Sequence, residues 1–148
     1  MLRRSRRRVL TTSLLTAETV ICLLLARLAL VCLSFQRITV LISRQSLRPE
    51  VWGRKRRLAR ITVNRAIFNV WRRFPLRTTC FHRAIAAHFM LRRRGVSTTL
   101  YYGATSLPNR GLTGHVWLQD GFAFVVGRRA AKSHHVLARY PDGNSTMQ

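Results

Sequence analysis

The sequence predicts an α+β fold in which a helical N-terminal half precedes a helix packed on a small antiparallel sheet. Residues 1–75 are basic and apolar, and their pattern favours helices. A helical repeat then runs through residues 79–94, followed by β-branched and aromatic runs that turn residues separate. We therefore expect a helical region over 1–75, a core over 76–141 and a frayed tail over 142–148.

The charge of the chain narrows the classes of function. Its 148 residues carry 27 Lys and Arg against 4 Asp and Glu, so the net charge is +23, which attracts polyanions, anionic lipids or acidic proteins. A hydrophobic fraction of 47% is too high for a disordered basic tail. The four acids, Glu18, Glu50, Asp120 and Asp142, are scattered, which argues against a paired-carboxylate hydrolase and a magnesium site. Three cysteines make no disulfide framework and indicate a reducing compartment.

The N-terminal half combines arginine clusters with apolar runs. Residues 1–8 are basic, and apolar stretches follow over 19–35 and 38–43, as in a signal peptide or membrane anchor. No small-residue cleavage site follows, and Arg27 interrupts the run, so a buried or partner-facing helix is favoured over a membrane span. Residues 48–77 are also predicted to be helical, with Pro75 ending the helix near Phe74.

The helix over 79–94 has start and stop signals. Its apolar face has helical spacing, and Thr78 or Thr79 can cap its first turn. Arg92, Arg93 and Arg94 suit the negative end of the helix dipole, and Gly95 suits its termination.

Strands are predicted after Gly95, over 96–103, 115–119 and 122–126. Asp120 and Gly121 form a hairpin signal between the last two. Residues 104–114 are rich in turn residues, and we expect a loop there. A short helix is expected around 132–139.

Cys80 is the candidate nucleophile. In the first turn of a capped helix, backbone N–H groups and the dipole favour the thiolate, which is the attacking species. The alternative is a small buried core residue. A zinc site of Cys80, His82 and His115 is conceivable, but the paired-ligand spacing of zinc sites is missing.

A nucleophilic cysteine needs a base, and His115 is the histidine that geometry permits. His82 points to another side of the helix, and His88 is eight residues on, about 12 Å along the axis. His134 and His135 lie in a predicted loop. His115 begins a strand, whose end can lie beside the start of the helix, and it shares a face with Trp117.

Two ordered segments, "TTCFHRAIAAHFMLRRRGVSTTLYYGA" and "GHVWLQDG", resemble the lasso-peptide leader peptidases. These are the protease half of the split lasso B protein, in the transglutaminase-like (papain-related) cysteine protease superfamily. The resemblance covers about residues 76–126. It implies a cysteine peptidase with Cys80 as nucleophile and His115 as base, without cofactor or metal.

The resemblance also implies partners. The enzyme would remove the leader from a precursor peptide with the help of a separate leader-recognition protein, and an asparagine-synthetase-like cyclase would take the freed core. We expect a cytoplasmic protein, with a peripheral membrane contact compatible with this activity and no specific nucleic acid.

The third catalytic residue departs from the family. The aspartate of the lasso-peptide leader peptidases would fall at Val126 or Gly127 of this chain. Gln119 stands where their motif has a glutamate. Asp120 is the one acid near His115 in sequence and is the candidate third member, although shaping the hairpin turn is its alternative role. Two readings without catalysis stay open, a basic nucleic-acid-binding protein and a membrane-attached protein.

Overall fold

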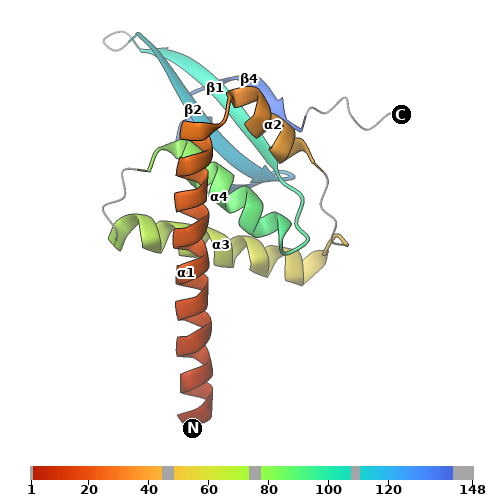
Figure 1. The fold of residues 1–148 in the computed structure, drawn as a ribbon. Helices are drawn as coiled ribbons and strands as arrows, with labels where there is room; N and C mark the ends of the chain where they lie inside the picture. Colours follow the sequence, from red (N-terminus) through yellow and green to blue (C-terminus); the bar gives the residue numbers. More distant parts are fainter. Residues whose placement is uncertain (1, 45–48, 74–77, 108–110, 142–148) are drawn as a thin grey trace.

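The structure is a computed structural model that describes residues 2–44, 49–73, 78–107 and 111–141. It contains helices and one four-stranded sheet, and Figure 1 shows α1 crossing in front of α3 and α4, with the sheet behind them. The elements are α1 (Leu2–Cys32), α2 (Phe35–Ser43), α3 (Gly53–Arg73), α4 (Cys80–Arg92), β1 (Thr99–Leu107), β2 (Gly111–Asp120), β3 (Ala123–Val126), α5 (Arg128–Ala131) and β4 (His135–Tyr140). The α+β class predicted from the sequence is confirmed.

Helix α4 forms close to where it was predicted. Thr79 precedes it in an extended conformation, and its backbone N–H donates to Nδ1 of His82, 3.0 Å away. After Arg92 the chain turns back at Gly95, whose φ of 70° is the left-handed conformation that glycine adopts readily. A Cβ atom there would also lie 2.5 Å from the carbonyl oxygen of Pro49. Both the backbone conformation and the lack of space therefore favour glycine at this position.

The sheet is antiparallel with the order β3-β2-β1-β4. The hairpin predicted at Asp120 and Gly121 is present, and Gly121 has a φ of 57°. The predicted loop over 104–114 is wrong at both ends, because β1 continues to Leu107 and β2 starts at Gly111. Residues 108–110 lie outside the described residues.

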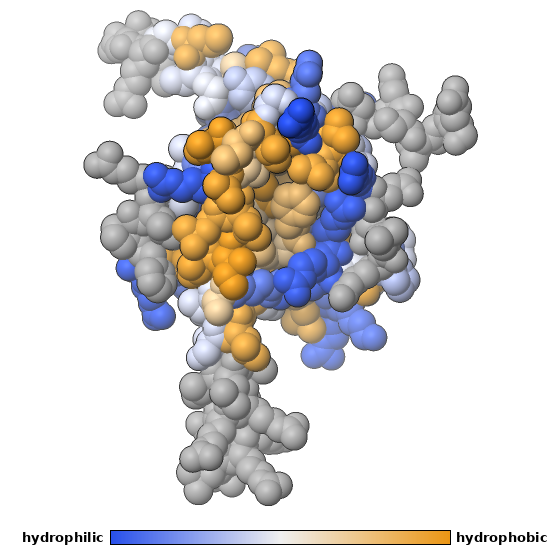
Figure 2. All heavy atoms as spheres, viewed as in Figure 1, coloured by the Kyte–Doolittle hydropathy of each residue, from blue (hydrophilic) through white to orange (hydrophobic). Residues whose placement is uncertain are grey.

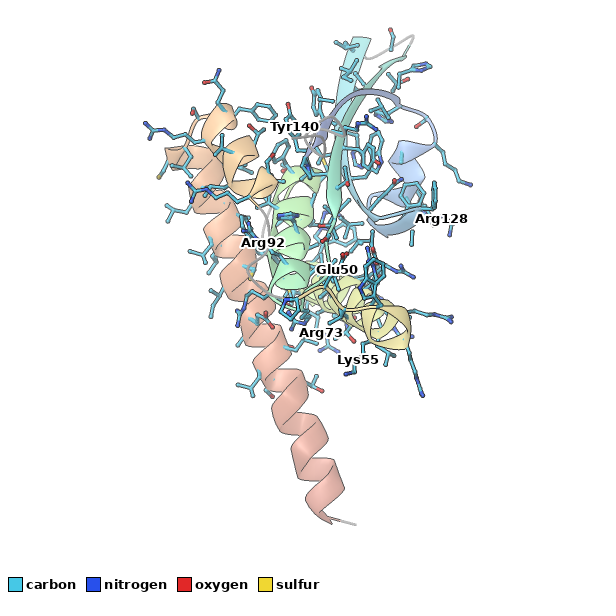
Figure 3. The ribbon with its side chains drawn as sticks, turned by 90° about the vertical axis from the view of Figure 1, so that its right-hand side faces the viewer. Glu50, Lys55, Arg73, Arg92, Arg128 and Tyr140 are labelled. Atoms are coloured by element: carbon cyan, nitrogen blue, oxygen red, sulfur yellow. The ribbon has the colours of Figure 1, made fainter. Side chains whose placement is uncertain are left out.

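The helix predicted around 132–139 is also wrong. The chain forms the short helix α5 and then β4, which pairs with β1 at the edge of the sheet. Since β3 and β4 lie at opposite edges, the segment between them crosses one face of the sheet, and Figure 3 shows α5 with Arg128 on the side away from α4.

One core joins the helices to the sheet. Leu23 of α1, Ile67 of α3 and Met90 of α4 are almost fully buried in the same cluster as Leu100 and Leu118 of the sheet. Burial of this kind stabilises a fold by roughly 1.5–3 kcal/mol for each large apolar side chain. Residues 74–77, which hold the predicted boundary between helical region and core, lie outside the described residues, as does the tail from 142 on.

Helix α1 is less buried than expected for a helix in a core. Its window over Thr12–Cys32 has a mean hydropathy of 2.1, enough to cross a membrane by length and composition, yet only 17% of it is buried. One face packs on α3 and α4 and the opposite face is open.

The described acids all bind arginines. Glu18 pairs with Arg94 at 2.6 Å, which holds the pKa of that carboxyl below its usual value. Glu50 and Asp120 both pair with Arg56, at 2.8 and 2.6 Å. Arg56 and Arg94 therefore both form ion pairs within the protein.

Candidate active site

Cys80 is the first residue of α4, as the sequence predicted. Its thiol is free and partly buried against the core. His82 closes the capping box with Thr79, and its ring nitrogen accepts the Thr79 N–H only when neutral. Burial, followed by the charge of Arg27, lowers the pKa of His82, which keeps it neutral. His82 thus has a role in capping, and the described residues hold no cluster of three metal-binding side chains.

His115 lies on β2, opposite Gly103 of β1. Strand alternation puts His115 and Trp117 on one face, while Val116 and Leu118 join the core on the other. Trp117 stacks on Tyr101, with ring centroids 5.7 Å apart and planes only 4° apart. The segment from β3 to β4 covers this face and brings the His134 ring to 5.5 Å from that of His115.

Three causes lower the pKa of His115. Burial is the largest, and the charges of His134 and Arg83 follow. Arg83 comes one turn after Cys80 in α4 and lies 4.7 Å over the Trp71 ring. The charge of Arg83 is thus one cause of this shift, although the body of α4 packs on the opposite face of the sheet.

Four buried side-chain atoms in the described residues lack a hydrogen-bond partner. Among the described side chains they are Thr78 Oγ1, Arg83 Nε, His115 Nε2 and His88 Nε2. The first two flank Cys80 in sequence, and the third belongs to the candidate base. Unpaired buried groups are rare in folded proteins, and a catalytic role is one reason for their presence.

The thiol of Cys80 and the ring of His115 are not hydrogen-bonded to each other in the described structure. The body of α4 packs on the face of β2 that holds Val116 and Leu118, whereas His115 lies on the other face. Catalytic hydrogen bonds are often long in ligand-free enzymes and shorten when substrate binds. The pairing of Cys80 with His115 stays a prediction.

The structure does not bring Asp120 to His115. Asp120 lies five residues along β2, roughly 16 Å away, and on the other face. Its carboxylate is buried, with 2% of the side chain exposed, and binds Arg56 and Arg60 at 2.6 and 3.1 Å. These contacts fasten the β2–β3 hairpin to α3.

Of the two positions where the family would place its acid, Gly127 cannot take a longer side chain. Gly127 has a φ of 85°, and a Cβ there would lie 2.6 Å from Cβ of Trp117. Val126 pairs with Leu118, three residues from His115. Asp142 lies outside the described residues, and every described acid binds arginine, so the described part of the chain offers His115 no carboxylate.

Sequence reasoning overlooked two neighbours of His115. His134 was expected in a loop, and Arg83 was given no role beside His115. Both depend on long-range packing, of the β3–β4 crossover and of α4, and no local pattern signals either contact.

The comparison with protein families identifies the superfamily of the chain. The sequence profile of the Transglutaminase-like superfamily, which includes cysteine peptidases, matches residues 20–139. No curated protein and no solved structure matches the chain. The matched segment begins in α1 and ends in β4, so it takes in the helical layer as well as Cys80 and His115. The chain therefore belongs to the Transglutaminase-like superfamily.

Proposed function

We propose that this protein is a cysteine peptidase that removes the leader from a ribosomally made lasso-peptide precursor. The observation that supports the catalytic part is the match to a superfamily of cysteine-dependent enzymes, together with buried polar atoms that lack a hydrogen-bond partner on His115 and on two residues near Cys80 in sequence. The leader-peptide substrate rests on the resemblance of the segments around these two residues to the lasso leader peptidases.

The proposed reaction has two steps. The neutral His115 accepts the proton of the Cys80 thiol, the thiolate attacks the carbonyl carbon of the scissile peptide bond, and His115 then gives this proton to the departing amine of the core peptide. The leader is then bound to Cys80 as a thioester. Water, deprotonated by His115, hydrolyses this thioester and frees the leader carboxylate and the thiol. The backbone N–H of Cys80, at the positive end of α4, is placed to stabilise the oxyanion.

The described part of the chain offers the His115 imidazole no carboxylate partner. An acid normally orients the ring and stabilises the imidazolium. In this chain burial, followed by the charges of His134 and Arg83, lowers the pKa of His115, so the neutral base is favoured over the imidazolium. We infer a Cys80–His115 dyad, with turnover slower than in relatives that keep the acid.

The substrate would approach along the edge of β2. Strand β3 pairs with β2 only from Leu118 onward, so the described part of the chain leaves the edge over 111–117 without a strand partner. An extended peptide can bind such an edge by adding a strand. His115 lies within this stretch, which would place an extended leader next to the proposed base.

The test is a reconstituted cleavage assay. It contains this protein with a precursor peptide and a leader-recognition domain taken from genes that neighbour its own, and mass spectrometry follows the release of the leader. We expect Cys80→Ala to abolish cleavage and His115→Gln to lower the rate by roughly 10²-fold or more. The matched controls, Cys32→Ala and His135→Gln, change exposed residues and should cleave as the unmodified protein does.

Cleavage by Cys80→Ala at the unmodified rate would sink the proposal. Failure of the unmodified protein to cleave, together with tight and steeply salt-dependent binding to duplex DNA or RNA, would support a basic nucleic-acid-binding protein instead.

A further inference from the structure

Helix α1 carries a second apolar face that no element in the described part of the chain covers. Six large side chains on it are between 48% and 79% exposed: Leu14, Ile21, Leu24, Leu25, Leu28 and Val31. At 3.6 residues per turn they fall within an arc of roughly 120°. The buried residues Thr19, Leu23 and Ala26 lie on the opposite side of the helix. Soluble proteins rarely expose a continuous apolar surface of this kind without a binding role.

The apolar surface extends beyond α1. Phe35 and Val40 of α2 are 47% and 56% exposed. Figure 2 shows the hydrophobic patch running over the upper part of α1 toward α2, with hydrophilic side chains along its borders. The outer face of α1, as we call the arc from Leu14 to Val31, is the main part of this patch.

The composition of the outer face fits hydrocarbon better than a protein partner. Between Leu14 and Val31 the arc contains only Leu, Ile, Val and Ala, so it has no side chain that can form a hydrogen bond. Protein interfaces usually contain about one hydrogen bond for each 100–200 Å² and a polar rim. A lipid interior requires none.

The charges beside the patch fit an anionic surface. Arg27, Arg37 and Arg44 are exposed, and Arg93 keeps 67% of its side chain exposed. Glu18, the one acid in α1 and α2, is bound to Arg94 and is 18% exposed. Cations that flank an apolar helix face attract anionic lipid headgroups, at about 1 kcal/mol for each residue near the surface.

The packing of α1 favours a helix that lies in the membrane surface over one that crosses it. Its inner face contributes Leu23 and Ala26 to the core and holds the Glu18–Arg94 ion pair against α4. A helix that crossed the bilayer would have to give up these contacts. An interfacial helix keeps them, because it buries only one apolar face about 5–10 Å into the headgroup region.

We propose that the outer face of α1 docks the protein on a bilayer rich in anionic phospholipid, with α1 lying in the interface. This inference does not rest on the proposed peptidase activity, since it uses no residue of the candidate active site.

Vesicle flotation tests the proposal. The full chain is produced by cell-free translation with vesicles of phosphatidylglycerol and phosphatidylcholine, or of phosphatidylcholine alone. We expect the chain to float with the anionic vesicles and at least tenfold less with the neutral ones. Leu25→Gln/Leu28→Gln should lower partitioning at least tenfold, whereas Leu58→Gln, which changes a leucine of α3 with similar exposure of 52%, should stay within twofold.

A fluorescent label distinguishes insertion of the outer face from attraction by charge alone. Cys32 is exposed at the end of α1 and is labelled with an environment-sensitive dye in a Cys22→Ser/Cys80→Ala background. We expect a blue shift on anionic vesicles for the Cys32 dye and none for a dye at Leu58→Cys in a background that also has Cys32→Ser.

Three results would overturn the proposal. They are absence of flotation, equal loss of flotation in the outer-face and Leu58 variants, and resistance to alkaline carbonate extraction, which would show a membrane span. Loss of binding to the leader-recognition domain in Leu25→Gln/Leu28→Gln, with flotation unchanged, would assign the surface to a protein partner instead. Each result is independent of peptide cleavage.

Discussion

At the scale of single residues, His115 is partly buried, with the His134 ring 5.5 Å from its own. Burial, His134 and Arg83 lower its pKa below the ordinary 6.5. The charges of His134 and Arg83 disfavour the protonated form of His115. His134→Gln and Arg83→Gln should therefore each raise the pKa of His115. Because burial is the larger cause, the value should stay below 6.5 in both variants. NMR titration of the His115 ring measures this, with His135→Gln as control, and a pKa that neither variant raises would contradict the described contacts.

His88 makes the stability depend on pH. Burial, followed by the charge of Arg92, lowers its pKa to about 4, and its Nδ1 lies 2.9 Å from the Thr98 hydroxyl. The unfolded chain, with a histidine pKa near 6.5, binds the proton more readily, so stability is complete above pH 6.5 and falls as the pH drops toward 4. The loss over this window should be about 3 kcal/mol.

Denaturant unfolding at a series of pH values checks this prediction. His88→Gln keeps a polar group toward Thr98 but cannot titrate, so its free energy of unfolding should change much less between pH 6.5 and 4. An equally steep dependence in this variant would show that another group is responsible.

At the scale of elements, Asp120 joins the β2–β3 hairpin to α3. We expect Asp120→Asn to lower the free energy of unfolding by roughly 2–3 kcal/mol, less than for a fully buried pair, because Arg56 and Arg60 keep 20% and 24% exposure. Glu50→Gln removes a more exposed partner of the same Arg56 and should cost less than about 1 kcal/mol.

Urea unfolding of the two variants separates the roles considered for Asp120. A large loss of stability, with the cleavage rate retained where the protein is folded, is expected from a structural residue. Unchanged stability with a much lower cleavage rate would instead support Asp120 as the third catalytic member.

The elements that the sequence predicted well are those whose signals are local. Helix α4 has its cap at Thr79 and its stop at Gly95, and the β2–β3 hairpin has its turn at Asp120 and Gly121. Strand β4 was mistaken for a helix because it exists through pairing with β1, a contact distant in sequence. The ends of β1 and β2 were missed for the same reason, since their pairing with each other extends the strands into a segment rich in turn residues.

At the scale of the whole molecule, the sequence could predict the candidate nucleophile and base but not their surroundings. Cys80 and His115 were found from order and local geometry. The crossover that covers His115, and the arginines that bind Asp120, come from packing that joins α3, the sheet and α5. The exposure of one face of α1 could not be predicted either. An apolar helix has the same sequence pattern whether one of its faces is buried or both are.

The central claim is that Cys80 forms a thioester with the leader. Rapid acid quenching of the enzyme with precursor and recognition domain, followed by mass spectrometry of the intact protein, measures it most directly. We predict an adduct with the mass of the leader on the peptide that contains Cys80, present with Cys32→Ala and absent with Cys80→Ala. Leader release by Cys80→Ala, or an adduct on any other residue, would contradict the account.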